Sequence, residues 1–190
     1  MSDIERPASF YDETLRKELQ EEGWKKPEMI PRFAYAIAEL KRLRVKTILD
    51  IGCGKGGFLS LCQANGFICY GFDFSSVALD ICKKYNKLEN VWVGNALDKE
   101  NYIDEYDAYL AIQTLEHIDK DLDVIRNLKP DIAFIFSLPG WSPKPRSGHL
   151  RGFGSDDSIR QRYGEIVDIK NIKKFRKRRV VTSLTLEGTG

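Results

Sequence analysis

The chain has 190 residues and a formal net charge of +2, so its length favours one domain and its charge excludes polyanion binding over the whole surface. Hydrophobic residues make up 42% and charged residues 31% of the sequence, as in ordinary globular proteins. No apolar run approaches the roughly 20 residues of a membrane-spanning helix. Residues 1–22 also lack the apolar stretch of a secretory signal. We therefore expect a cytoplasmic protein with no membrane partner.

The first predicted element in chain order is a helix over residues 10–22, whose Phe10-Tyr11 end is a candidate lid. A second helix leads into the first strand and is marked by apolar residues at helical spacing: Phe33, Ile37, Leu40 and Leu43. We accordingly predict an N-terminal helical lid segment over residues 1–27 and a main domain over residues 28–190.

Strand and helix patterns alternate from residue 46 onward. Short apolar runs predict five strands, over residues 46–51, 67–73, 90–95, 106–112 and 131–137. Three helices lie between strands: one over residues 56–65, one capped by Ser75, and one that Asp119 or Asp121 opens and Pro130 stops. Residues 138–154 predict a long loop. After it come a short helix that ends at Tyr163 and two strands, over residues 165–171 and 179–187.

These patterns predict an α/β fold with a seven-stranded, mostly parallel sheet and helices on both of its faces. The last two strands are joined by a short turn, so they cannot both run parallel to the others. One strand must therefore be antiparallel, at or near an edge of the sheet.

Four cysteines fall in a predicted loop, helix, strand and helix, and they form no Cys-x-x-Cys pair: Cys53, Cys62, Cys69 and Cys82. This pattern disfavours a disulfide or a zinc site. We expect the thiols to be reduced and mostly buried.

A glycine-rich turn follows the first strand. Gly52, Gly54 and Gly57 satisfy the pattern G-x-G-x-x-G, and Asp73 lies 21 residues after Gly52, where a ribose-binding acid is expected. Such a turn lets a ligand approach the backbone at the N-terminus of a helix. The pattern suits dinucleotides and S-adenosylmethionine alike.

Asp50 distinguishes these two ligands. It lies two residues before Gly52, where a carboxylate would repel a pyrophosphate but can accept a hydrogen bond from an amino group. S-adenosylmethionine carries an ammonium and a sulfonium group, whereas NAD carries two phosphates. We therefore favour S-adenosylmethionine as the cofactor over a dinucleotide and an oxidoreductase.

Four segments in order carry a family resemblance: residues 48–58 (ILDIGCGKGGF), 70–76 (YGFDFSS), 92–98 (WVGNALD) and 107–118 (DAYLAIQTLEHI). From about residue 28 to residue 187, the chain resembles the class I, Rossmann-like S-adenosylmethionine-dependent methyltransferases. The resemblance implies a seven-stranded sheet whose last strand is antiparallel. It also implies that a set of residues binds the cofactor: Asp50, Gly52, Cys53, Gly54, Asp73, Phe74, Asn95, Ala96 and Gln113.

The resemblance also implies a role for each part of this set. Asp50 and the glycines hold the methionine part of the cofactor, and Asp73 accepts hydrogen bonds from both ribose hydroxyls. Phe74 packs on the adenine, residues 95–96 border its edge, and Gln113 lies near the methyl group. Simpler structural roles remain open: a helix cap for Asp50, a turn for Asp73 and core packing for Phe74.

The candidate catalytic residues are the only two histidines, His117 and His149, together with Glu116. Methyl transfer needs a general base only when the acceptor arrives protonated. Both histidines follow strands whose carboxyl ends form the ligand-binding edge of such sheets, and a histidine there can act as a base near neutral pH. Alternatively, residues 116–117 only begin a helix and His149 is an exposed loop residue.

A metal site is a second interpretation of the same segment. Some small-molecule and RNA 3′-end methyltransferases of this class place Glu-x-x-Glu-His at this position, and the RNA enzymes add a distant histidine. The corresponding set here is Gln113, Glu116, His117 and His149. Because Gln113 replaces the first acid and removes a strong ligand for a hard cation, we predict no metal.

The remaining candidates are aromatic or basic. Trp141 either stacks on an acceptor ring or anchors its loop, and Arg146 or Arg151 can pair with a phosphate or carboxylate. Residues 170–179 carry seven basic residues in ten. This run is typical of the solvated rim and turn of a hairpin, with contact to an anionic partner as the alternative.

The preferred prediction is an enzyme that transfers a methyl group from S-adenosylmethionine to an oxygen or nitrogen of a small-molecule acceptor, such as a sugar or another metabolite. The chain has almost no predicted domain beyond the methyltransferase fold with which to bind a macromolecule, which favours a small acceptor. The alternatives are an RNA methyltransferase, whose binding would fall steeply with salt, and a non-catalytic S-adenosylmethionine-binding module. The sequence leaves the acceptor and the oligomeric state open.

Overall fold

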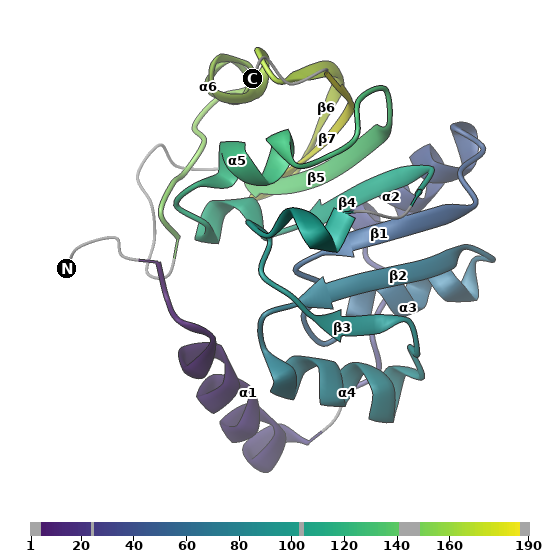
Figure 1. Cartoon of the computed structure of the whole chain (residues 1–190), viewed down its shortest axis with the longest axis vertical. Coiled ribbons are helices and arrows are strands. Elements are labelled where there is room, and N and C mark those ends of the chain that lie inside the picture. The colour runs from purple at the N-terminus through teal and green to yellow at the C-terminus, as the bar shows by residue number, and fades with distance from the viewer. Residues whose placement is uncertain (1–4, 24, 103–104, 141–148, 187–190) are drawn as a thin grey trace.

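The structure is a computed structural model that describes residues 5–23, 25–102, 105–140 and 149–186. Figure 1 shows a central sheet flanked by helices, with α1 at the lower left. The helices and strands are α1 (Ala8–Glu22), α2 (Pro31–Arg42), β1 (Thr47–Ile51), α3 (Gly57–Ala64), β2 (Ile68–Asp73), α4 (Ser76–Asn86), β3 (Val91–Val93), η1 (Lys99–Tyr102), β4 (Ala108–Ile112), η2 (Leu115–His117), α5 (Asp121–Arg126), β5 (Ala133–Pro139), α6 (Asp156–Tyr163), β6 (Val167–Phe175) and β7 (Arg178–Thr185).

The strands form one seven-stranded sheet in the order β3-β2-β1-β4-β5-β7-β6. The first five strands of this order pair in parallel, whereas β7 runs antiparallel to both of its neighbours, β5 and β6. The single antiparallel strand thus lies beside the edge strand, which confirms the predicted fold. The strand order reverses between β1 and β4, and ligands bind at such a reversal in open α/β sheets.

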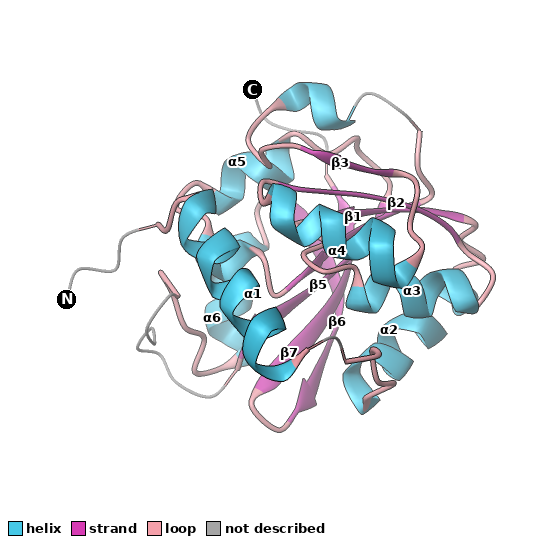
Figure 2. Ribbon diagram, turned by 90° about the horizontal axis from the view of Figure 1, so that it is seen from below, coloured by secondary structure: helices cyan, strands magenta, loops and turns pink. Residues whose placement is uncertain are grey.

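A hydrophobic core lies on each face of the sheet. Helices α2, α3 and α4 cover one face, where Leu40 and Leu59 are fully buried. Helices α5 and α6 cover the other, where Phe136 and Tyr163 are fully buried. Figure 2 shows α2 and α3 on one side of the strands and α5 and α6 on the other. This packing on both faces holds the strand ends, and the turns that follow them, in fixed positions.

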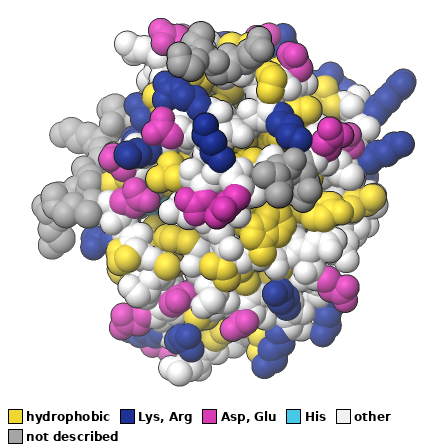
Figure 3. Space-filling view, viewed as in Figure 1, with side chains coloured by type: hydrophobic (Ala, Val, Ile, Leu, Met, Phe, Trp, Pro, Cys, Tyr) yellow, Lys and Arg dark blue, Asp and Glu magenta, His cyan; other side chains and the backbone are white. Residues whose placement is uncertain are grey.

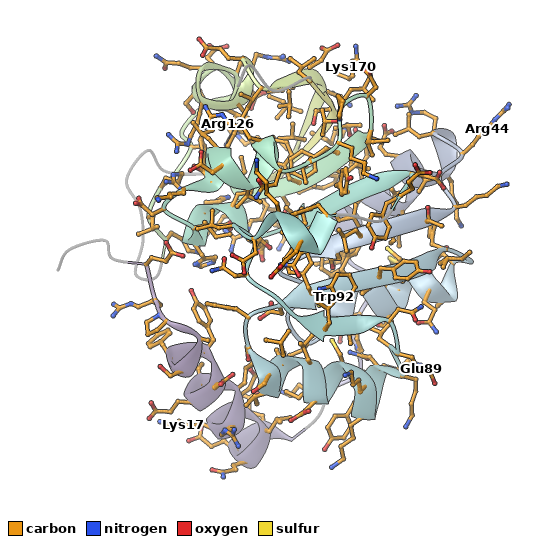
Figure 4. The ribbon with its side chains drawn as sticks, in the orientation of Figure 1. Lys17, Arg44, Glu89, Trp92, Arg126 and Lys170 are labelled. Carbon is orange, nitrogen blue, oxygen red and sulfur yellow. The ribbon has the colours of Figure 1, made fainter. Side chains whose placement is uncertain are left out.

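The basic segment 170–179 is mostly strand, so its predicted hairpin boundaries are wrong. β6 continues to Phe175 and β7 begins at Arg178, which leaves only Arg176 and Lys177 in the turn. The polar pattern resembled a turn because β6 is an edge strand and exposes most of its side chains. Figure 4 shows Lys170 projecting away from the sheet at the top of the view.

Helix α5 begins at Asp121, one of the two predicted starting residues, but the Asp121 carboxylate does not cap the helix because it is buried and bound elsewhere. Arg162 donates to both of its oxygens, and the hydroxyl of Tyr163 donates to Oδ2 at 2.7 Å. Arg151 Nη1 also lies 3.3 Å from Oδ2. The cluster ties α5 to α6 and to the segment that precedes α6.

The surface and the thiols agree with the expected globular domain. All four cysteines are free and buried, as predicted. Within the residues that the structure describes, no helix is long and apolar enough to cross a membrane. Figure 3 shows acidic and basic side chains interspersed over the face in view, without a large area of one sign.

Candidate active site

A pocket of about 370 Å³ opens at the carboxyl ends of β1, β2, β3 and β4. The turns that follow these strands form one wall, and α1 with the segment before it forms another. The lining contains eight of the nine predicted cofactor-binding residues: Gly52, Cys53, Gly54, Asp73, Phe74, Asn95, Ala96 and Gln113. The fold therefore brings together residues that are as far as 61 positions apart in the sequence.

The turn after β1 requires glycine at two positions for different reasons. Gly52 has a φ of +69°, and a Cβ there would lie 2.5 Å from Cγ2 of Thr114. A side chain would therefore strain the backbone and collide with the end of β4. Gly54 has a φ of +54° and no atom within 4 Å of the position of a Cβ. At Gly54 only the left-handed backbone conformation favours glycine, because a side chain there would extend into open space beside the pocket.

Asp73 ends β2 and connects the glycine turn to α4. Its Oδ2 accepts a hydrogen bond from the Gly54 N–H at 2.9 Å, and its Oδ1 accepts one from the Ser75 N–H at 2.9 Å. Burial raises the pKa of Asp73, and these two hydrogen bonds oppose the rise. Each carboxylate oxygen has further acceptor capacity at the pocket wall.

Asp50 lies in β1 behind the pocket rather than on its lining. Its side chain is buried, and within the described part of the chain Oδ1 has no hydrogen-bond partner. Burial, with a second contribution from the charge of Asp73, raises the pKa of the Asp50 carboxyl to about 7. An unpartnered buried oxygen costs free energy, so this position favours a nearby cationic or donor group.

Phe74 and Tyr11 form the aromatic side of the pocket. Phe74 is 40% exposed, so it is not a core residue. The rings of Tyr11 and Phe74 lie 5.3 Å apart, and the Tyr11 hydroxyl lies 3.4 Å from Nδ1 of His117. On the same helix, Asp12 accepts a hydrogen bond from the Ser75 hydroxyl. Helix α1 thus contacts both the turn after β2 and the segment after β4.

The turn after β3 carries Asn95 and Ala96 to the pocket. The indole N–H of Trp92 donates to Oδ1 of Asn101 at 2.8 Å, and the Asn101 amide donates to the carbonyl of Asn95 at 2.9 Å. Figure 4 shows Trp92 on β3 in the interior of the view. Oδ1 of Asn95 accepts from the Leu97 N–H at 3.0 Å, so this side chain also stabilises its own turn.

Gln113 follows β4 with a φ of +61°, a conformation that is costly for a residue with a side chain. It lines the pocket and lies beside Arg178, the first residue of β7. When the amide oxygen of Gln113 faces Arg178, it accepts hydrogen bonds from Nη2 at 3.2 Å and from Nε. The end of β4 is thereby coupled to the antiparallel strand.

Glu116, His117 and His149 form a cluster in which one ligand atom from each lies within 4.8 Å of the others. His117 lines the pocket, and its ring centre lies 4.7 Å from that of His149. Glu116 is fully buried, and neither of its carboxylate oxygens has a hydrogen-bond partner among the residues that the structure describes. Burial raises the pKa of Glu116 to about 7. Burial, His117 and Arg178 lower the pKa of His149 to about 4. The cluster can bind a proton or a divalent cation.

Residues 9–163, more than half of the chain, match the methyltransferase domain family. The chain belongs to this family. Family membership and the sheet topology confirm the resemblance to class I, Rossmann-like S-adenosylmethionine-dependent methyltransferases.

The methyltransferase is similar to the ubiquinone biosynthesis O-methyltransferase of Histophilus somni, with 29% identity over 120 residues that cover 56% of the chain and 50% of that protein. The chain thus spans about half the length of the curated relatives it matches. Two solved structures share its fold. The S-adenosylmethionine-dependent methyltransferase from Anabaena variabilis aligns with a TM-score of 0.67, 15% identity and coverage of 98% of this chain and 99% of that one. The N-methyltransferase NodS from Bradyrhizobium japonicum, in complex with S-adenosyl-L-homocysteine, aligns with a TM-score of 0.67, 16% identity and coverage of 92% and 97%.

Sequence reasoning missed Thr114 and Arg178 in the methyltransferase. The Thr114 hydroxyl donates to the carbonyl of Ile51 at 3.0 Å and fixes the spacing between β1 and β4. Its position two residues after the fourth predicted strand was the only available signal. Arg178 lies in a ten-residue segment that contains seven basic residues, and only the register of β7 shows that it turns towards Gln113.

One predicted acceptor contact is wrong. Arg151 donates to the carbonyls of Leu115, Ile118 and Asp119, so its guanidinium stabilises the segment around η2 and is not free for a phosphate or carboxylate. Trp141 and Arg146 lie outside the described residues, so their predicted roles stay predictions.

Proposed function

We propose that the methyltransferase transfers a methyl group from S-adenosylmethionine to an oxygen or nitrogen of a small-molecule acceptor. The observation that carries the proposal is the buried Asp73 carboxylate, which two backbone N–H groups hold at the pocket wall. In that position it can accept hydrogen bonds from the two ribose hydroxyls, as the family resemblance implies. The enclosing α1 supports an acceptor small enough to enter beside the cofactor.

The glycine turn fits the methionine end of this cofactor. Gly54 leaves open space at the backbone, and the buried Asp50 provides an unpartnered oxygen for an ammonium group, directly or through water. A cation close to Asp50 would also favour its ionised form. When bound, the cofactor supplies a methyl group that its sulfonium already activates.

His117 is the proposed general base. It lines the pocket, whereas Glu116 and His149 lie behind it, and Tyr11 contacts its Nδ1. We assign Glu116 and His149 as residues that position the His117 ring and adjust its basicity. This arrangement serves an acceptor whose hydroxyl or protonated amine must lose a proton.

The decisive experiment has two measurements on the purified chain. Calorimetry should show S-adenosyl-L-homocysteine binding that Asp73→Ala weakens. A radiolabelled methyl-transfer assay should then find an acceptor in a panel of hydroxyl- and amine-bearing metabolites and RNA oligonucleotides. Cofactor binding without turnover of any acceptor would favour a non-catalytic S-adenosylmethionine-binding module. Turnover of RNA alone would favour the RNA alternative.

Metal-assisted transfer is the second candidate function. Glu116, His117 and His149 offer one carboxylate and two imidazoles, and both Glu116 oxygens lack partners. These three residues fit a divalent cation, which would supply Lewis-acid activation of an acceptor oxygen. Against it, Gln113 is a neutral ligand and Arg178 brings positive charge close to Glu116 and His149. Chelator-resistant activity would exclude this candidate, and saturable Mn²⁺ binding that Glu116→Gln abolishes would support it.

Three further assignments belong to this proposal. We place the enzyme in the cytoplasm, where free thiols stay reduced. Residues 1–27 act as the lid, supported by the contacts of α1 with Phe74, Ser75 and His117. RNA binding is less favoured, because acidic and basic side chains alternate over the face shown in Figure 3.

A further inference from the structure

Arg178 and Arg32 differ from three other arginines near the site, Arg151, Arg162 and Arg179. Arg151 and Arg162 pair with Asp121, and Arg179 pairs with Asp156. In the part of the chain that the structure describes, Arg178 and Arg32 form no ion pair with an acid. Both are partly buried. A guanidinium withdrawn from water without an anion is a cost to the folded protein.

Arg178 lies one side chain away from the pocket. Its Nη2 and Nε face the amide oxygen of Gln113, and Gln113 lines the pocket near the carboxyl end of β4. An amide oxygen is neutral, so it satisfies two donors without neutralising the charge. Glu116 provides only partial compensation, because burial raises its pKa to about 7 despite the nearby Arg178.

Arg32 reaches the same region from α2, which packs against β7. Its Nε is buried and has no hydrogen-bond partner among the described residues, and its guanidinium lies 4.8 Å from the centre of the Phe33 ring. Burial and, second, the charge of Arg178 lower the pKa of Arg32. The contact between α2 and β7 thus places two positive charges, Arg32 and Arg178, on neighbouring elements, where they disfavour each other.

We propose that Arg178 and Arg32 bind an anionic group of the methyl acceptor, a carboxylate or a phosphate, beside Gln113. An oxyanion there relieves the repulsion and accepts the paired N–H donors of a guanidinium. It also directs the remainder of the acceptor towards Gln113 and His117 on the pocket wall. The inference rests on the proposed methyl transfer and specifies its substrate class as acidic acceptors.

The binding test uses the full chain, treated with chelator and saturated with S-adenosyl-L-homocysteine. Three matched aromatic probes are titrated by NMR: benzoate, phenyl phosphate and neutral benzamide. The expected result is saturable binding of one or both anions at least fivefold tighter than that of benzamide. The stronger of the two anions identifies the acceptor as a carboxylate or a phosphate. Equal binding of all three probes overturns the proposal, as does anion binding that appears only after Mn²⁺ is added.

The variants localise the anion. Arg178→Gln and Arg32→Gln should each weaken binding of the preferred anion at least fivefold, and Arg178→Lys should restore part of it. Arg176→Gln is the matched control, because it removes the same charge from an exposed position two residues away. Unchanged S-adenosyl-L-homocysteine affinity shows that each variant is folded. The proposal fails if Arg178→Gln and Arg176→Gln behave alike.

An activity measurement separates this inference from the proposed function. Hydroxy acids and their methyl esters are compared as acceptors, and the preference is the kcat/KM for the acid divided by the kcat/KM for its ester. The acid should be preferred at least tenfold by the native enzyme, and Arg178→Gln should reduce that preference mainly through KM. Turnover without preference overturns the inference and leaves methyl transfer intact. Arginine-dependent anion binding without turnover of any acceptor supports the anion site and contradicts the proposed methyl transfer.

Discussion

The two ends of the pocket are built on different principles. At the glycine end, Asp73 is held by the backbone of Gly54 and Ser75 before any ligand binds. At the proposed acceptor end, the Glu116 oxygens have no partner among the described residues, and Arg178 has only neutral ones there. At the first end Asp73 is already held in place and one oxygen of Asp50 awaits a partner, whereas the second end keeps several polar groups that need a ligand or ion. A preformed cofactor end and an unsatisfied acceptor end are what a transferase with one fixed donor and one particular acceptor requires.

The largest expected effect is on turnover at the acceptor end. His117→Gln should lower kcat by roughly 10²–10⁴-fold, the usual contribution of a general base. S-adenosyl-L-homocysteine affinity should stay within twofold, because the change lies away from Asp73. Tyr11→Phe, which removes only the hydroxyl near Nδ1, should cost less. If the affinity for S-adenosyl-L-homocysteine falls together with kcat in His117→Gln, the two ends of the pocket do not act independently.

The next effect is on stability at the glycine end. Gly52→Ala places a side chain at positive φ and against Thr114. It should lower the free energy of unfolding by more than the roughly 1–3 kcal/mol of backbone strain alone. Gly66→Ala is the control, because it has a φ of +91° and no atom within 4 Å of its Cβ position. Equal losses in urea unfolding would show that the Thr114 contact is not important.

A smaller effect concerns the buried acid at each end. The folded pKa values of Asp50 and Glu116 are both raised to about 7. The folded state therefore retains protons that the unfolded state releases, so each acid's contribution is complete at low pH and is lost as pH rises towards 7. Between pH 5 and pH 8 the free energy of unfolding of the unsubstituted protein should therefore fall. In Asp50→Asn or Glu116→Gln this fall should be smaller, by up to about 3 kcal/mol for each substitution. Urea unfolding at several pH values checks this, and a slope unchanged by both substitutions would contradict the assigned shifts.

The smallest expected effect tests the preformed cofactor end. Asp73→Ala should weaken S-adenosyl-L-homocysteine binding by about 1–3 kcal/mol through the loss of charged hydrogen bonds. Asp80→Ala, on the exposed side of α4, is the matched control. Calorimetry that gives the same affinity for both variants would remove Asp73 from the site.

The two ends also differ in how well the sequence predicts them. The glycine end follows from short segments, because the backbone conformation of residues 52–54 and the acid at Asp73 leave local signals. The acceptor end combines Gln113, Arg178 and His149 from three parts of the chain, and their approach depends on the order and register of β4, β5 and β7. Hydrophobic periodicity predicts which elements form, but it does not predict which basic side chain turns inward.

The same reason explains two local features of the fold that the sequence does not show. Asp121 has the sequence position of a helix cap, yet it is buried against Arg162 and Tyr163 because α6 packs over it. The strand β6 resembles a turn in sequence because its lysines are exposed. In both cases tertiary packing outweighs the local preference.

The unpaired side of β6 has a consequence for the behaviour of the protein at high concentration. An edge strand offers free backbone donors and acceptors to any other strand, including that of another molecule. Lys170, Lys173 and Lys174 are exposed along this edge. Two copies that joined their sheets edge to edge would bring these ammonium groups together, and the repulsion would oppose the growth of a continuous intermolecular sheet. We therefore expect the lysines of β6 to oppose edge-to-edge aggregation.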